Sequence, residues 1–133
     1  MSGSAGTTRT IREGGDSTIQ VRPVPGLVVL WSELPIPGDG IYPLQAEMTI
    51  GREPDCTVFF DDPGLSRRHA VVSWVRGKLS VEDQGSHNGT FLEGRCLKAD
   101  KPLPFRAILR CGSTILLAVP DTEMFRGWRI WGP

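Results

Sequence analysis

Short apolar segments separated by glycine and proline turns constrain the fold of this chain more than any other feature. The segment at residues 27–31 reads LVVLW, and β-branched and large apolar residues of this kind favour strands. The cluster DDPG at residues 61–64 and the pair RG at residues 76–77 mark turns between such segments. No window shows a sustained helical period. The sequence therefore predicts an all-β fold, a sandwich of two mainly antiparallel sheets.

About ten strands are predicted, at short and regular spacing. They cover residues 27–31, 41–44, 47–51, 56–60, 69–75, 78–82, 90–92, 95–97, 107–110 and 114–119. The segment 27–31 is apolar on both faces, so we expect it to lie inside a sheet and to be covered on both sides.

Length and composition divide the chain and exclude several functional classes. The 133 residues suit one domain, which we place at residues 23–120. Residues 1–22 are rich in Ser, Gly and Thr and are predicted to be a disordered tail, to which residues 19–21 could add a short edge strand. Residues 121–133 are predicted to be either a last strand or a linker to a following domain.

The charge balance argues against a dedicated nucleic-acid binder. Lys plus Arg and Asp plus Glu number 15 each, whereas such proteins usually carry a strong positive excess. No apolar run is long enough to cross a membrane. The N-terminus lacks the basic and then apolar pattern of a signal peptide, so we expect a cytoplasmic protein.

The cysteines predict neither a disulfide framework nor a metal site. Cys56, Cys96 and Cys111 are odd in number and have no paired spacing. We expect reduced thiols packed as small hydrophobic side chains, and no cofactor or metal.

Three polar islands fall at strand boundaries, where a sandwich gathers its loops. They are Gly51-Arg52, Ser66-Arg67-Arg68-His69 and His87-Asn88-Gly89-Thr90. If these loops converge, they supply guanidinium, hydroxyl and amide donors with few acceptors, which is the complement of a phosphate. Arginine suits this task because its planar fork gives two parallel charge-assisted bonds to one oxyanion.

Each island also has an ordinary interpretation when taken alone. An arginine at a strand end is usually a solvated charge, and Asn-Gly is a common hairpin turn. Ser66 and His69 invite a hydrolase interpretation, but no nucleophile elbow surrounds the serine. We therefore expect a binding module and not an enzyme. A protein–protein scaffold that uses another surface, without phosphate dependence, is the alternative.

Taken together and in this order, the islands resemble the signature of forkhead-associated (FHA) domains of the bacterial type. The resemblance rests on Gly51-Arg52, on Ser66-x-x-His69 and on Asn88-Gly89-Thr90, and it extends over about residues 27–119. It implies an eleven-stranded β-sandwich that binds phosphothreonine in a partner protein through loops at one end.

The resemblance also implies a role for each site residue. Arg52, Ser66 and Arg67 would bind the phosphate, and Asn88 would hold the peptide backbone on either side of it. His87 would contact ligand residues and help to set specificity. The residues that would shape the site without touching the ligand are Gly51, His69, Gly89 and Thr90.

A wider context follows from the same resemblance. The partner would be a Thr-phosphorylated protein or peptide made by a Ser/Thr kinase, with no nucleic acid or membrane in direct contact with this domain. Some bacterial FHA domains precede the ATPase domain of sigma-54-dependent transcription activators, so transcription regulation is one expected setting. The threonines at positions 7, 8, 10 and 18 could be phosphorylated and bound by the same chain, or the tail could be inert; the sequence leaves both open.

Overall fold

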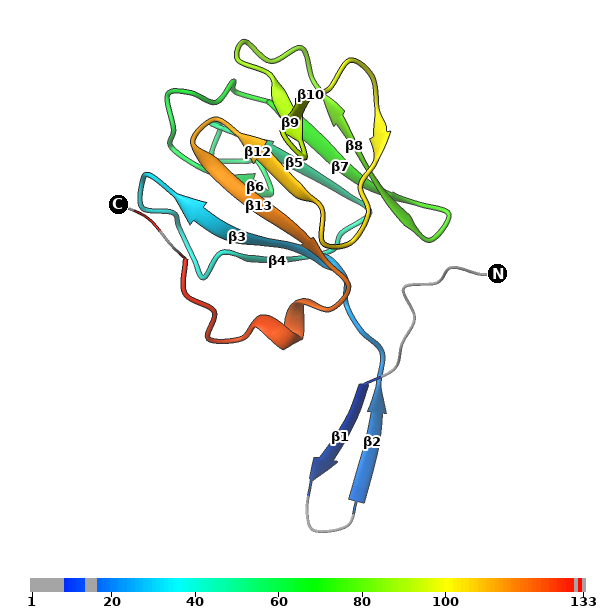
Figure 1. Cartoon of the computed structure of the whole chain (residues 1–133). Coiled ribbons are helices and arrows are strands. Elements are labelled where there is room, and N and C mark those ends of the chain that lie inside the picture. The colour runs from blue at the N-terminus through cyan, green and yellow to red at the C-terminus, as the bar shows by residue number, and fades with distance from the viewer. Residues whose placement is uncertain (1–8, 14–16, 131, 133) are drawn as a thin grey trace.

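Eleven strands form a two-layered sandwich in the computed structural model, which describes residues 9–13, 17–130 and 132 (Figure 1). One sheet has six strands in the order β10-β9-β12-β13-β3-β4, and the other has five in the order β11-β8-β7-β5-β6. The strands of the first sheet are β3 (Gly26–Ser32), β4 (Ile41–Pro43), β9 (Thr90–Leu92), β10 (Arg95–Cys96), β12 (Ile108–Cys111) and β13 (Thr114–Val119). Those of the second are β5 (Glu47–Gly51), β6 (Val58–Phe59), β7 (Ala70–Val75), β8 (Lys78–Asp83) and β11 (Lys101–Pro102).

The predicted sandwich of mainly antiparallel sheets is confirmed. Every ladder in the two sheets is antiparallel except that of β5 with β6, where Ile50 pairs with Val58 and Gly51 with Phe59. The β6 strand is shorter than the predicted segment 56–60, and β11 occupies a proline-containing stretch that was not predicted to be a strand. The edge position of β11 explains this, since Pro102 there needs no backbone donor on its open side.

The core lies between the sheets and follows the alternation of the strands. In β7, Ala70 and Val72 are fully buried while Val71 and Ser73 are only partly buried. The same period places Met48 and Ile50 of β5 in the core. The alternation of buried and exposed side chains on both sheets therefore gives one continuous core. The loops at the ends of the strands lie outside this core.

The C-terminal segment covers the outer side of the six-stranded sheet at β3 and β4. Val28, like its neighbours Leu27 and Val29, has no exposed surface, although it lies outside the core cluster between the sheets. Trp128 donates its indole N–H to the Val29 carbonyl at 2.9 Å, which fixes the segment along β3 (Figure 1). This cover accounts for the apolar character of β3 on both faces.

The predicted C-terminal strand is wrong for the described part of residues 121–133. The chain there forms a 3-10 helix, η1 (Thr122–Phe125), followed by irregular backbone through Ile130. Asp121 is the reason, because its side chain accepts a hydrogen bond from Glu123 N and so favours a helical turn over an extended chain. The alternative, a linker to a following domain, stays a prediction.

The N-terminal region also differs from the expected disordered tail. The strands β1 (Arg9–Glu13) and β2 (Ser17–Val21) pair with each other in an antiparallel two-stranded sheet that projects from the sandwich (Figure 1). Residues 17–21 therefore do not join an edge of either large sheet. The serine-rich composition pointed to disorder, whereas the β-branched residues within both segments favour extended backbone. The prediction of disorder for residues 1–8 and 14–16 falls on positions outside the described residues.

Two further expectations concern the thiols and the membrane. All three cysteines are unpaired, but only Cys56 and Cys111 are buried; Cys96 is exposed because β10 is a two-residue edge strand. The expectation of packed thiols is thus wrong for Cys96. Among the residues that the structure describes, no helix is long and apolar enough to cross a bilayer.

Candidate functional site

The three polar islands meet at one end of the sandwich. The first follows β5, the second precedes β7 and the third precedes β9, and the turn between β12 and β13 lies at the same end (Figure 1). These connections are loops on a rigid scaffold, so small side-chain differences there do not disturb the core.

The first and second islands are joined by their backbones at Gly51. Arg52 N donates to the Ser66 carbonyl at 3.0 Å, and Glu53 N to the Arg67 carbonyl at 3.3 Å. A Cβ atom on Gly51 would lie 2.1 Å from the Arg67 carbonyl oxygen, a distance that no side chain tolerates. Glycine at position 51 therefore permits the close approach that brings Arg52 and Arg67 to the same place.

His69 joins the second island to the third. The ring has no exposed surface; its Nδ1 accepts from Ser66 N at 3.1 Å and its Nε2 lies 2.8 Å from the Gly89 carbonyl oxygen. Because Nδ1 receives a backbone N–H, the proton of the neutral ring is on Nε2, which donates to the carbonyl. His69 is thus a buried brace between two loops and does not face the solvent.

Asp83 fixes the third island through hydrogen bonds to its carboxylate. Its carboxylate accepts hydrogen bonds from the Ser86 backbone N–H at 2.9 Å, from the Ser86 hydroxyl and from the Thr90 hydroxyl at 2.7 Å. Burial by itself raises the pKa of Asp83, but these hydrogen bonds outweigh it, and the pKa lies below its ordinary value. Thr90 is fully buried and serves this network.

Asp62 fixes the loop that precedes the second island in the same manner. Its carboxylate accepts from Gly64 N at 2.8 Å, from Ser113 N at 2.9 Å and from the Ser113 hydroxyl at 2.8 Å. Here too burial raises the pKa, and hydrogen bonds from Ser113 and Gly64 bring it below the ordinary value. Neither aspartate was singled out from the sequence. The DDPG turn was a usable signal for Asp62, whereas Ser113 lies 51 residues away.

The arginines of the site differ in how they are paired. Arg68 forms an exposed ion pair with Asp55 at 2.8 Å. Arg52 donates Nε to the Leu65 carbonyl at 3.0 Å, which fixes the side chain while leaving both Nη atoms. Among the described residues, neither these Nη atoms nor the guanidinium of Arg67 has a hydrogen-bond or ion-pair partner. Both arginines are exposed and their backbones are adjacent, so two unpaired cationic side chains project from this end of the molecule.

Ser66 and Asn88 are oriented by the loops that meet around them. The Ser66 hydroxyl oxygen accepts from the backbone N–H of His87 at 2.9 Å, so its own proton remains to be donated. Asn88 donates its amide N–H to the Gly64 carbonyl at 3.0 Å, which leaves the amide oxygen as an acceptor. Ser66 thus ties the second island to the third, Asn88 ties the third island to the loop that precedes the second, and both side chains keep hydrogen-bonding capacity for a ligand.

The remaining predicted site residues lie at the same loop. His87, in the third island, is exposed to solvent. Gly89 has φ +87°, a conformation that L side chains rarely adopt, and an added Cβ atom would lie 3.1 Å from Cys96 Sγ. All nine predicted residues are therefore brought to this end of the molecule. In the part of the chain that the structure describes, no group of three His, Cys, Asp or Glu residues is placed to hold a metal.

Comparison with known proteins agrees with this geometry. The glycogen accumulation regulator GarA of Mycolicibacterium smegmatis is 34% identical over 80 residues, which are 60% of this chain and 51% of the relative. The oxoglutarate dehydrogenase inhibitor of Corynebacterium efficiens is 44% identical over 48 residues, 36% of this chain and 34% of the relative. The matched segments thus span about half or less of these relatives.

A solved structure shows the same fold. An FHA domain studied for its phosphothreonine-dependent interactions superposes with a TM-score of 0.60 at 25% identity, over 73% of this chain and 95% of that one. The FHA domain family model matches residues 48–118, which include all three islands. The chain therefore belongs to the FHA domain family.

Proposed function

We propose that this chain is a signalling module that binds phosphothreonine in a partner protein through the loops at one end of the sandwich. The observation that carries the proposal is the meeting of unpaired donors there. Arg52 offers both Nη atoms, Arg67 its guanidinium and Ser66 its hydroxyl proton, while the nearby carboxylates of Asp62 and Asp83 are occupied by other donors. A dianionic phosphate is the ligand that matches this set.

The roles divide between phosphate and peptide backbone. Arg52 is held by Leu65 so that its fork binds the phosphate, and Ser66 donates its hydroxyl to a second phosphate oxygen. Asn88 uses its amide oxygen to accept from a peptide N–H, while one N–H of its amide nitrogen is held by the Gly64 carbonyl. His87, exposed at the tip of the third island, contacts residues that flank the phosphothreonine.

The strength of these bonds sets the expected discrimination. Each charge-assisted hydrogen bond contributes about 1.5–3 kcal/mol, so two of them separate a phosphorylated from an unmodified peptide by about a hundredfold or more. Preference for threonine over serine is a smaller effect. Burial of one methyl group contributes about 0.8 kcal/mol, or about a fourfold difference.

The test is a titration of the whole chain with phosphothreonine, phosphoserine and unphosphorylated versions of an oriented peptide library. Arg52→Ala should weaken phosphothreonine binding by at least about a hundredfold. The matched control is Arg68→Ala, which removes the same charge from the neighbouring strand entry. Because Arg68 is exposed and paired with Asp55, its loss should change the affinity by no more than about twofold.

Other outcomes would move the function elsewhere. Equal loss in both variants would mean that general positive charge, and not the geometry of the site, attracts the peptide. No binding to any pool by the folded chain would favour the scaffold alternative. The surface to examine would then be the apolar hollow of about 290 Å³ beside the β7–β8 turn, lined by Leu79, Pro102, Leu103 and Phe105.

The wider setting remains part of the proposal. Phosphothreonine recognition requires a Ser/Thr kinase in the same compartment, for which we expect the cytoplasm. The relatives are a metabolic regulator and an enzyme inhibitor, which supports regulation by binding in place of catalysis. The sigma-54 setting and binding of the chain's own N-terminal threonines stay predictions.

A further inference from the structure

The buried carboxylate of Asp62 links two segments that are far apart in the sequence. Asp62 is 5% exposed; one oxygen accepts from Gly64 N and the other from the backbone N–H and hydroxyl of Ser113, in the turn between β12 and β13. That turn is shaped to fit it, since Gly112 has φ +58° and an added Cβ atom there would lie 2.7 Å from Asp62 Oδ2. The contact is therefore a close and specific junction between loops.

The segment that Asp62 fixes carries the two carbonyl groups that orient the ligand-binding side chains. The Leu65 carbonyl accepts from Arg52 Nε at 3.0 Å, and the Gly64 carbonyl accepts from Asn88 Nδ2 at 3.0 Å. Asp62 binds Gly64 N with its side chain and accepts from Leu65 N at 2.9 Å with its own carbonyl. The hydrogen bonds to Asp62 therefore fix the backbone of Gly64 and Leu65, and with it the direction of their two carbonyl groups.

We propose that Asp62, anchored by Ser113, is a positioning residue of the phosphate site that aims Arg52 and Asn88 through the Leu65 and Gly64 carbonyls. This inference rests on the proposed function, which gives Arg52 and Asn88 their ligand contacts. Asp62 itself does not touch the ligand. Asp62 is an acidic residue that supports the binding of an anion. Its negative charge is bound by three donors, and the loop conformation that it fixes determines where the Arg52 guanidinium is held.

A purely electrostatic role and a positioning role of Asp62 predict opposite changes in ligand affinity when its charge is removed. Removal of a negative charge near a phosphate should strengthen binding of the dianion through simple Coulomb attraction. Loss of a positioning contact should weaken it, because the guanidinium is then no longer preorganised. The sign of the change in affinity therefore separates the two roles.

The experiment compares Asp62→Asn with Asp61→Asn in the whole chain. Both substitutions remove one negative charge from adjacent residues, but Asp61 is exposed and Asp62 is buried in the loop junction. The side-chain amide introduced by Asp62→Asn can still accept from Gly64 through its oxygen, but its nitrogen cannot accept from Ser113. Ser113→Ala is the milder variant, since it removes one hydroxyl donor and keeps the backbone N–H.

Two quantities are measured for each variant: the affinity for a phosphothreonine peptide, and the NMR signal and exchange rate of the Arg52 Nε–H. We expect Asp62→Asn to bind about tenfold or more weakly and Ser113→Ala about threefold more weakly, with faster exchange of the Arg52 Nε–H in both. Asp61→Asn should bind as tightly as the wild type or more tightly, with an unchanged Arg52 signal.

The outcomes separate this inference from the proposed function. A folded Asp62→Asn chain with wild-type affinity and an unchanged Arg52 signal would overturn it. If Asp62→Asn does not fold, an unchanged affinity and Arg52 signal in Ser113→Ala would do the same. If the wild type binds no phosphopeptide, the proposed function fails; the Arg52 signal of the free variants still decides whether Asp62 positions that side chain.

Discussion

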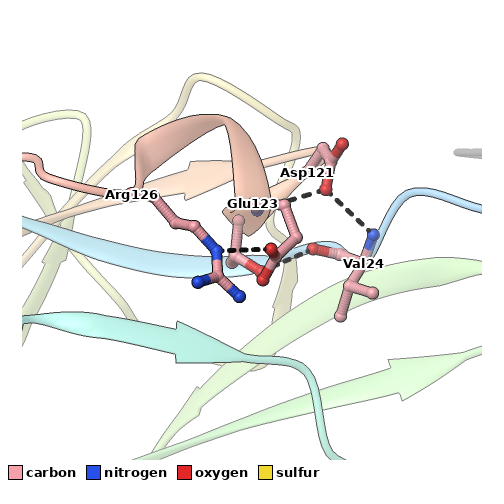
Figure 2. A network of polar contacts seen from close by, with 5 residues as sticks. Val24, Asp121, Glu123 and Arg126 are labelled. Carbon is pink, nitrogen blue, oxygen red and sulfur yellow. Dashed lines mark hydrogen bonds and ion pairs between the residues drawn. The ribbon is translucent and has the colours of Figure 1, made fainter. Parts of the chain in front are cut away.

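The loops that carry the three islands and the C-terminal segment are both fixed by buried aspartates, but they differ in how their arginines are paired. At the C-terminal end, Asp121 accepts from Val24 N and Glu123 N, both at 3.2 Å, and Arg126 is bound to Glu123 at 2.6 Å (Figure 2). At the loop end, Asp62 and Asp83 accept from backbone and hydroxyl donors in the same manner. There, however, neither Arg52 nor Arg67 forms an ion pair with a carboxylate among the described residues.

This difference indicates which polar network serves binding. A carboxylate that accepts backbone N–H groups stabilises a turn wherever it occurs, so such bonds alone do not mark a functional site. What distinguishes the loop end is that the carboxylates of Asp62 and Asp83 accept from neutral donors and pair with neither Arg52 nor Arg67, whereas Arg68 is paired with Asp55. In the C-terminal segment, by contrast, the carboxylate of Glu123 pairs with the guanidinium of Arg126.

The largest expected effect comes from breaking the loop end at His69. His69→Ala removes a ring with no exposed surface and leaves Ser66 N and the Gly89 carbonyl without the partner they share. We expect the free energy of unfolding to fall by roughly 3 kcal/mol and phosphopeptide binding to be lost. Urea unfolding and peptide titration measure both.

The other histidine is the control for that variant. His87→Ala removes an exposed ring from the neighbouring loop, so the free energy of unfolding should stay within about 0.5 kcal/mol of the wild type. Comparable losses of stability in the two variants would show that His69 does not brace the two loops.

A smaller effect is expected at the C-terminal segment. Asp121→Ala removes the acceptor of Val24 N and Glu123 N and should lower the free energy of unfolding by about 1–2 kcal/mol. Phosphopeptide affinity should not change, because this network lies away from the loops. Loss of affinity in a folded variant would contradict the separation of the two regions.

Low pH should reduce the free energy of unfolding, because protonation removes the hydrogen-bonded carboxylates of Asp62 and Asp83. Their pKa values are lower in the folded chain than the ordinary value of about 3.9 expected when unfolded. Their contribution to stability is therefore complete above that value and is lost as the pH falls through the folded-state pKa. Urea unfolding from pH 7 to pH 3 should show this loss, and Asp83→Asn should show a shallower decline. An identical decline in that variant would mean that other groups govern it.

The smallest effect is expected for Arg126→Ala. The guanidinium is exposed and its ion pair with Glu123 spans one turn of η1, so solvent competes with the interaction. Neither the midpoint of thermal unfolding nor the phosphopeptide affinity should change measurably. A clear drop in either would show that the ion pair of Arg126 with Glu123 does more than hold η1.

The predictable part of this protein lies where local chemistry repeats. Apolar segments bounded by loop and turn residues located β5, β9 and β13 at their observed bounds, because strand and turn preferences are both local properties of the sequence. The segment after Asp121 was not predictable in this way. Its apolar residues fit a strand as well as a cover over β3, and a single carboxylate acceptor decided for η1.

The sequence by itself determined the all-β sandwich, the FHA resemblance and the identity of the polar residues at the loop end. Only the tertiary structure decided that Arg68 is paired with Asp55 while Arg52 and Arg67 stay available, and that Ser113 anchors Asp62. The physical reason is distance along the chain. Strand period and turn chemistry act over a few residues, whereas these hydrogen bonds join loops that become neighbours only after the two sheets have packed.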